Sequence, residues 1–263
     1  MDPRELDSLR QWFSEYCRSF YTNDPADQRN ITLKEEHTAN VCENMDEIAG
    51  SLGLLPERVA LAGAVALFHD LGRFPQYRRY RTFRDSVSTN HAALGAAVLI
   101  EKNVLARLDS RERDIVVRSV ALHNVFSLPD GIDADTRLFT TMVRDADKLD
   151  IWRVFIEYYE TPEEDRPAAA ALGLPDAPGY SPEVLAALLR GEMVDLSVLA
   201  TLNDFRLLQL AWIFDLNFPR SFELLRGRAI IDRLASYLPA DPEIKRAVSA
   251  VRAYGEGKLE RRS

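Results

Sequence analysis

Apolar residues recur at helical spacing along most of this chain, and alternating strand patterns are absent. An apolar stripe over residues 6–20 predicts a first helix. Thr32 and Glu35 have the spacing of a capping box, so we expect a second helix to begin there and to end near Leu52. The pattern therefore predicts an all-α fold.

Pro56 suits the first turn of a third helix, which we expect to end at Asp70 because Gly72 follows as a stop. Residues 73–85 are basic and rich in aromatic side chains, and we expect them to form a loop. The same periodicity predicts further helices over residues 89–107, 110–124, 135–159, 183–190, 195–216, 219–237 and 242–256.

Prolines and glycines are concentrated in residues 161–182, which predicts a connecting segment without regular helix. We therefore expect residues 1–160 to form a helical core that carries the candidate chemistry. Residues 183–263 are expected to add C-terminal helices that pack on the same core, because they are dense in apolar side chains.

Composition and charge limit the function classes. The chain has 263 residues, 46% hydrophobic and 28% charged, as is typical of a globular protein. Its net charge of -8 argues against binding to duplex nucleic acid or an anionic membrane. The two cysteines suggest no disulfide framework, and the N-terminus lacks the apolar stretch of a signal peptide. We expect a cytoplasmic protein; its oligomeric state is left open.

All four histidines, together with two aspartates, fall on apolar helix faces or at helix ends. A single histidine in such a place is more often a hydrogen-bonded core residue than a ligand. Two carboxylates on apolar stripes, however, need compensation by cations, and imidazole with carboxylate is a ligand set that transition metals prefer. The predicted metal ligands are His37, His69, Asp70, His91, His123 and Asp147.

The order of His37, the His-Asp doublet at 69–70 and Asp147 resembles the HD-domain superfamily of metal-dependent phosphohydrolases. Residues 67–73 look like the doublet motif of that family, and residues 146–150 look like its terminal aspartate motif. The resemblance covers about residues 30–155. It implies an HD-domain helical bundle, to which the C-terminal helices are an addition.

His91 and His123 resemble the added ligands of binuclear HD proteins, which implies two divalent transition-metal ions. Iron, manganese, nickel, cobalt and zinc all suit nitrogen and oxygen donors without thiolate. The Gly-Tyr-Pro signature of the cyclic-dinucleotide phosphodiesterases is missing, so a cyclic dinucleotide is not the expected substrate. By resemblance, His37, His69, Asp70 and Asp147 hold one ion, and His91 and His123 hold the other, with Asp70 bridging.

Phosphoryl transfer needs positive charge against the phosphate oxygens. Arg73 follows Asp70 by three residues and Lys148 adjoins a predicted ligand, so we expect both to bind phosphate. Asp70, Arg73 and Lys148 are the predicted catalytic residues. We also expect Asp85 to orient the imidazole of His91.

Asp145 and Asp150 are expected to lie on solvated faces or to pair locally. The predicted activity is hydrolysis of a phosphoester of a nucleotide or another small phosphorylated metabolite, through a metal-bound hydroxide. Two alternatives stay open. One is an HD-type di-iron oxygenase, and the other is a non-catalytic nucleotide-binding regulatory module.

Overall fold

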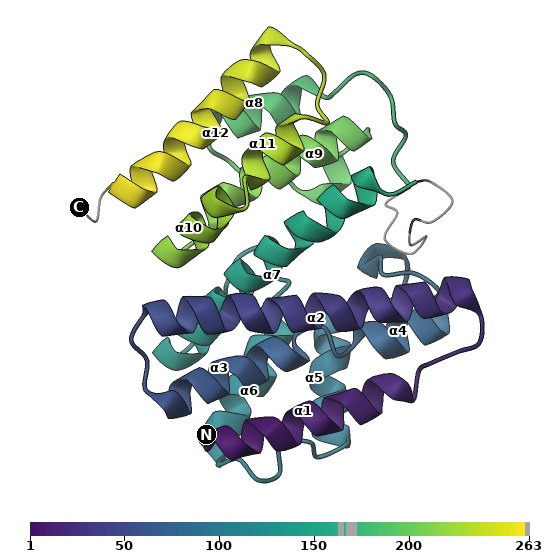
Figure 1. The fold of residues 1–263 in the computed structure, drawn as a ribbon, viewed down its shortest axis with the longest axis vertical. Coiled ribbons are helices and arrows are strands. Elements are labelled where there is room, and N and C mark those ends of the chain that lie inside the picture. Colours follow the sequence, from purple (N-terminus) through teal and green to yellow (C-terminus); the bar gives the residue numbers. More distant parts are fainter. Residues whose placement is uncertain (163–165, 167–172, 261–263) are drawn as a thin grey trace. The chain divides into compact units, whose positions relative to one another are not determined.

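The computed structural model describes residues 1–162, 166 and 173–260 (Figure 1). The described residues form helices and turns without any strand, which confirms the predicted all-α fold. They divide into two compact units, one containing Met1–Asp150 and the other containing Ile151–Thr161 and the described residues after 172. The division lies inside helix α7 (Ala134–Glu160). The domain boundaries expected from the sequence stay a prediction.

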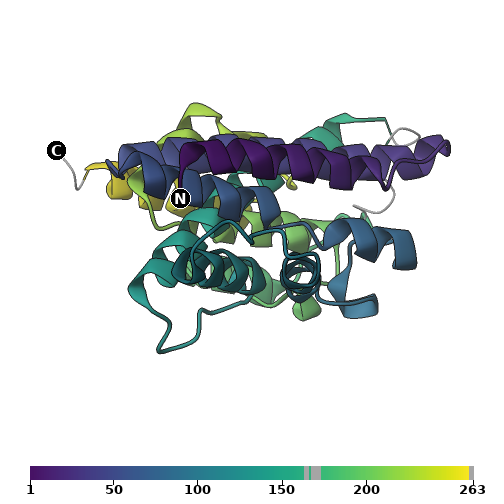
Figure 2. The same cartoon turned by 90° about the horizontal axis from the view of Figure 1, so that it is seen from below.

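The first unit is built around α3 (Pro56–Phe68), which contacts α1 (Pro3–Arg18) and α2 (Pro25–Ser51). Every side chain of α3 after residue 59 is buried, because the helix is apolar on all faces. Figures 1 and 2 show α1 running beside α3. The predicted start of α3 at its proline is confirmed.

Helix α2 begins well before the predicted capping box at Thr32. The side chain of Asp24 accepts hydrogen bonds from the backbone amides of Ala26 and Asp27, both at 2.9 Å, and Pro25 occupies the first turn. A capping aspartate followed by proline is a complete helix start, so Thr32 lies inside the helix. The predicted start of α2 was therefore wrong.

The basic segment after Gly72 is not the expected loop, because α4 (Arg73–Tyr80) occupies most of it. Its residues Phe74 and Tyr77 are buried, and this packing stabilises the helix. A short 3-10 helix, η1 (Asp85–Val87), follows. The next two helices are α5 (His91–Glu101) and α6 (Ser110–Leu122). Helix α5 is shorter than predicted, since the chain turns at Asn103, whose φ is 49°.

The second unit contains the end of α7 and all later helices. The predicted helix over 219–237 is broken at Ala229, where φ is 50°, and the one over 195–216 also consists of shorter pieces. Trp152 is fully buried and donates its Nε1 hydrogen to the carbonyl of Gln209 at 2.9 Å. The elements are α8 (Pro182–Arg190), η4 (Leu196–Val198), α9 (Leu202–Ala211), η5 (Trp212–Asp215), α10 (Pro219–Gly227), α11 (Ile230–Ala235) and α12 (Pro242–Glu260).

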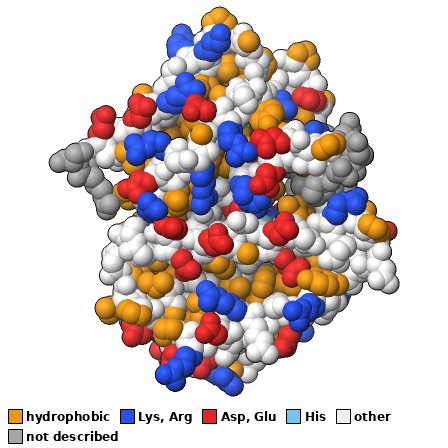
Figure 3. Space-filling view, viewed as in Figure 1, with side chains coloured by type: hydrophobic (Ala, Val, Ile, Leu, Met, Phe, Trp, Pro, Cys, Tyr) orange, Lys and Arg blue, Asp and Glu red, His pale blue; other side chains and the backbone are white. Residues whose placement is uncertain are grey.

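The predicted connecting segment at 161–182 lies partly outside the described residues, and its described part contains no helix before α8. Within the described part of the chain, no helix has both the length and the apolar character needed to cross a bilayer. On the face drawn in Figure 3, acidic and basic side chains are interspersed and do not gather by sign.

Candidate metal centre

The six predicted ligands come from five helices or helix ends of the first unit. His37 lies within α2, and the doublet at 69–70 directly follows α3. His91 is the first residue of α5, His123 directly follows α6, and Asp147 lies within α7. The four histidine residues are no more than 4% exposed. The predicted burial of the histidines is confirmed.

One half of the site contains two imidazoles and two carboxylates. The Nε2 atoms of His37 and His69 are 3.2 Å apart. Oδ1 of Asp147 lies 3.1 Å from Nε2 of His37 and 3.7 Å from Nε2 of His69. Oδ2 of Asp70 lies 3.5 Å and 3.8 Å from the same two nitrogens. One oxygen of each carboxylate thus lies within 3.8 Å of both imidazole nitrogens.

The other half contains the remaining two imidazoles. The Nε2 atoms of His91 and His123 are 3.0 Å apart. The second oxygen of Asp70, Oδ1, lies 3.2 Å from the first of these nitrogens and 3.9 Å from the other. The carboxylate of Asp70 thus directs one oxygen to each pair of histidines. His37, His69 and Asp70 could hold one metal ion, and Asp70, His91 and His123 could hold another.

The hydrogen bonds of the imidazoles fit metal ligation. Each Nδ1 atom lies 2.7–2.8 Å from an oxygen that can only accept, so in the neutral ring Nδ1 carries the proton and Nε2 carries the lone pair. Paired lone pairs at 3.0–3.2 Å repel each other unless a cation lies between or beside them. The four acceptors are Asp150, the carbonyl of Ala66, Asp85 and the carbonyl of Val120.

Burial keeps most of these rings neutral. It lowers the pKa of His91 to about 4, with Arg73 adding to the effect, and it lowers the pKa of His123 to about 4. The pKa of His69 is also lowered, again mainly by burial. Burial alone would lower the pKa of His37 too, but its hydrogen bonds to aspartates raise it above the usual value. Neutral imidazole is the form that binds metal.

Two cationic side chains contact Asp70. Lys34 donates to Oδ2 at 2.8 Å, and Nε of Arg73 lies 3.3 Å from Oδ1. Burial alone would raise the pKa of Asp70, but Lys34 and Arg73 hold it well below its ordinary value. Lys34 was not predicted from the sequence. It lies three residues before His37, and this spacing places two side chains on one face of a helix.

The two predicted phosphate-binding residues differ in their contacts. Nη1 of Arg73 lies 3.0 Å from Oδ1 of Asp85 and 3.0 Å from Oε1 of Gln76. Nη2 of Arg73 has no hydrogen-bond acceptor among the residues that the structure describes. The ammonium of Lys148 lies 3.4 Å from the carbonyl of Arg144, one turn earlier in α7. Their roles toward phosphate stay predictions.

Of the two placements expected for Asp145 and Asp150, the solvated face was wrong, because these residues are 0% and 1% exposed. Oδ2 of Asp150 accepts from Nδ1 of His37 at 2.7 Å. Asp150 lies three residues after the candidate ligand Asp147, so both face α2 from one helix. The predicted orientation of His91 by Asp85 is confirmed, with 2.7 Å between Nδ1 and Oδ2.

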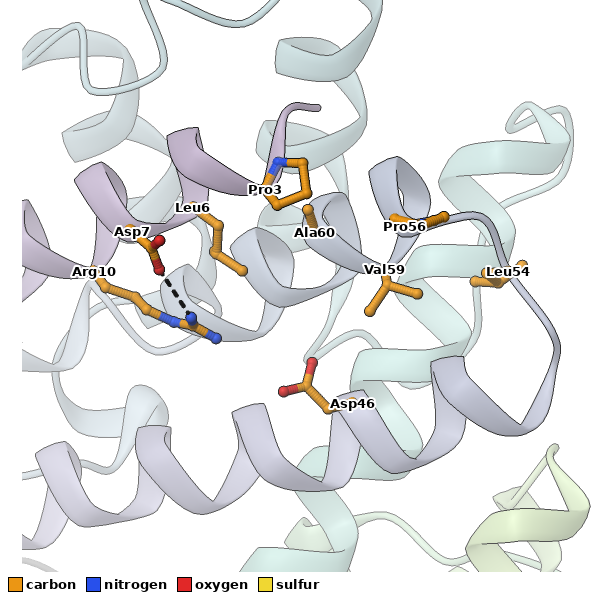
Figure 4. Close-up of a pocket in the computed structure, with 9 residues that line it drawn as sticks. All are labelled: Pro3, Leu6, Asp7, Arg10, Asp46, Leu54, Pro56, Val59 and Ala60. Atoms are coloured by element: carbon orange, nitrogen blue, oxygen red, sulfur yellow. Dashed lines mark hydrogen bonds and ion pairs between the residues drawn. The ribbon is translucent and has the colours of Figure 1, made fainter.

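Other features of the first unit lie apart from these ligands. The guanidinium of Arg78 lies 3.8 Å from the ring centroid of Phe20, and Arg81 forms an ion pair with Asp27. A pocket between α1, α2 and the start of α3 is lined by nine residues, none of which is a candidate ligand (Figure 4). It contains an exposed ion pair of 3.3 Å between Asp7 and Arg10.

No curated protein and no solved structure has a significant match to this chain. A match is found with a family model, that of the HD domain, and it covers residues 35–152. This range contains all six candidate ligands, from His37 to Asp147. Residues 35–152 therefore belong to the HD domain family.

Proposed function

We propose that this protein is a metal-dependent phosphohydrolase that cleaves a phosphoester of a nucleotide or another small phosphorylated metabolite. HD domains are generally found in metal-dependent phosphohydrolases. The observation that carries the proposal is the position of Asp70. Each of its oxygens faces a pair of imidazole nitrogens, and each also meets a cationic side chain. Metal ligands and phosphate-binding charge therefore occur in one buried cluster.

The donors suit two divalent ions, held by the sets predicted from the sequence, with Asp70 as the bridge. Iron, manganese, nickel, cobalt and zinc all accept imidazole and carboxylate ligands. When bound, such ions supply Lewis acidity toward a phosphoryl oxygen and lower the pKa of the attacking water. The protein holds the ligands in place through the acceptors at each Nδ1, which fix ring orientation and the protonated nitrogen.

We assign phosphate binding to Arg73 and Lys34, with Lys148 as a further candidate. The Nη1 atom of Arg73 is fixed by Asp85, so the guanidinium is held in one orientation while its Nη2 atom can donate to a non-bridging oxygen. The ring of Phe83 lies 5.2 Å from Nζ of Lys34 and 5.9 Å from Cζ of Arg73. This aromatic contact restricts both cations to the vicinity of Asp70.

The test is a substrate screen of the purified chain, loaded in turn with each of the five metals. Nucleotides and a generic phosphoester are offered, and released phosphate or product is measured. We expect turnover that Asp70→Ala abolishes. Asp7→Ala removes a carboxylate that is 76% exposed, and this control is expected to leave turnover unchanged. Absence of activity with every metal, or activity that persists in Asp70→Ala, would end the proposal.

The same preparations distinguish the two alternatives. Oxygen consumption by the iron-loaded protein, without phosphate release, would identify the di-iron oxygenase. A metal-loaded protein that binds a nucleotide tightly and turns over nothing would identify the regulatory module.

A further inference from the structure

The two halves of the candidate metal centre differ in the exposure of the carboxylate that accepts a hydrogen bond from a histidine. In the first half, the acceptor for His37 is Asp150, which is 1% exposed and lies on the same helix as the ligand Asp147. In the second half, the acceptor for His91 is Asp85, whose side chain is 30% exposed. Asp85 lies in η1, within the short stretch that joins α4 to α5.

The carboxylate of Asp85 connects three parts of the second half. Its Oδ2 accepts from Nδ1 of His91 at 2.7 Å and from Nδ2 of Asn124 at 3.2 Å. Asn124 directly follows the ligand His123. The Oδ1 atom of Asp85 accepts from Nη1 of Arg73 at 3.0 Å, and Arg73 contacts the bridging carboxylate. One side chain thus contacts a ligand, the neighbour of a second ligand, and a cation at the bridge.

Asp85 itself is held by Gln76, which is completely buried in α4. Nε2 of Gln76 lies 2.8 Å from Oδ1 of Asp85, 2.9 Å from Oγ of Ser88 and 2.9 Å from the carbonyl of Thr89. A single amide therefore contacts three residues of the stretch that leads into α5. The ring orientation of His91, at the first position of that helix, depends on this arrangement.

We propose that Asp85 is a positioning residue that sets the affinity of the second half for its metal ion, and that this ion binds more weakly than the first. The proposal rests on the two-ion part of the proposed function and is independent of the reaction. The second half offers three protein donors and the first half offers four. Without Asp85, the ring of His91 can rotate and its proton can move to Nε2, which then cannot bind metal.

The experiment titrates metal-free protein with Co²⁺ and with Mn²⁺ by calorimetry, and measures retained metal by elemental analysis after gel filtration. Wild type is expected to show a tight and a weak class, one ion each. In Asp85→Ala the weak class is expected to lose affinity roughly 10–100-fold, while the tight class is unchanged. Asp150→Ala, the matched change in the first half, is expected to weaken the tight class.

Circular dichroism and thermal melting of each metal-free variant establish that it is folded. Asp85→Asn, which keeps the side-chain shape, is expected to lose less metal affinity in the weak class than Asp85→Ala. The proposal is overturned if Asp85→Ala leaves both classes unchanged, if it weakens both equally, or if wild type binds only one ion. If wild type and Asp85→Ala bind metal as expected but wild type turns over no phosphoester, the proposed reaction is refuted and this inference stands.

Discussion

Gly72 lies at the closest approach between the turn that carries the doublet and the start of α5. A Cβ atom added there would stand 2.1 Å from the carbonyl oxygen of His91 and 2.6 Å from the backbone nitrogen of Gly95. A carbon and a carbonyl oxygen normally stay about 3.3 Å or more apart, so α5 would have to move by roughly 1 Å. Overpacking costs roughly 1–3 kcal/mol, and the upper end applies because both obstacles are backbone atoms.

We therefore expect Gly72→Ala to lower the free energy of unfolding by about 3 kcal/mol, or the Tm by roughly 6–12 °C for a unit of this size. Thermal unfolding of the metal-free protein, followed by circular dichroism, measures it. The control is Gly50→Ala in α2, where an added Cβ meets no atom within 4 Å. That change is expected to stabilise the helix by about 0.5–1 kcal/mol. Equal Tm values for the two variants would refute the reasoning.

Two further predictions concern a buried carboxylate and a buried guanidinium. Asp204 is 0% exposed and accepts hydrogen bonds from Ser181 and from the backbone before α9. Asp204→Ala is expected to lower the free energy of unfolding by roughly 2–3 kcal/mol at pH 7. Burial alone would raise the pKa of Asp204, but these hydrogen bonds lower it. The loss of unfolding free energy in Asp204→Ala is therefore full above about pH 4 and shrinks as the pH falls through the lowered pKa. Denaturant unfolding at pH 7 and pH 3 checks this, and a difference that grows on acidification would contradict it. Arg144 is 8% exposed and donates to the carbonyl of His123 at 3.2 Å and to the turn that follows. A lysine cannot span these acceptors, so Arg144→Lys is expected to lower the affinity for the second metal ion about 10-fold in the calorimetric titration. Arg137→Lys, on the surface, is the control and is expected to leave this affinity unchanged.

Local signals predicted most helix starts correctly, and packing decided the remainder. Pro56 opens α3 as expected, and Asp109 accepts from the amide of Glu112 at 2.8 Å, because a proline or a capping aspartate acts within one turn. The helix α4 was missed because its arginines suggested a solvated loop, whereas the burial of Phe74 against the rest of the first unit stabilises it. The break at Ala229 was missed because alanine rarely adopts positive φ, although α10 ends at Gly227 and a glycine can mark a helix end.

In the candidate metal centre, too, some residues could be predicted from local sequence signals and others could not. Its six candidate ligands could be singled out from the sequence because each lies in an apolar context that a solvated residue would not need. Lys34 and Asp150 were not predicted as part of the site, because a lysine or aspartate by itself usually lies in water. Each stands three residues from a ligand on the same helix, and this spacing was the available signal.

The charges of the cluster indicate why occupancy of the second half would matter for the proposed function. Four aspartates contact the imidazoles or the bridge, and two cations, Lys34 and Arg73, contact the aspartates. With neutral imidazoles this largely buried network carries a net charge of -2, which is costly unless it is compensated. One divalent ion would make the network neutral, and a second would make it positive by about two charges. If two ions bind as proposed, we therefore expect only the fully loaded cluster to attract a phosphate dianion. Asp85, through the second ion, would then also control whether an anionic substrate is drawn to the site.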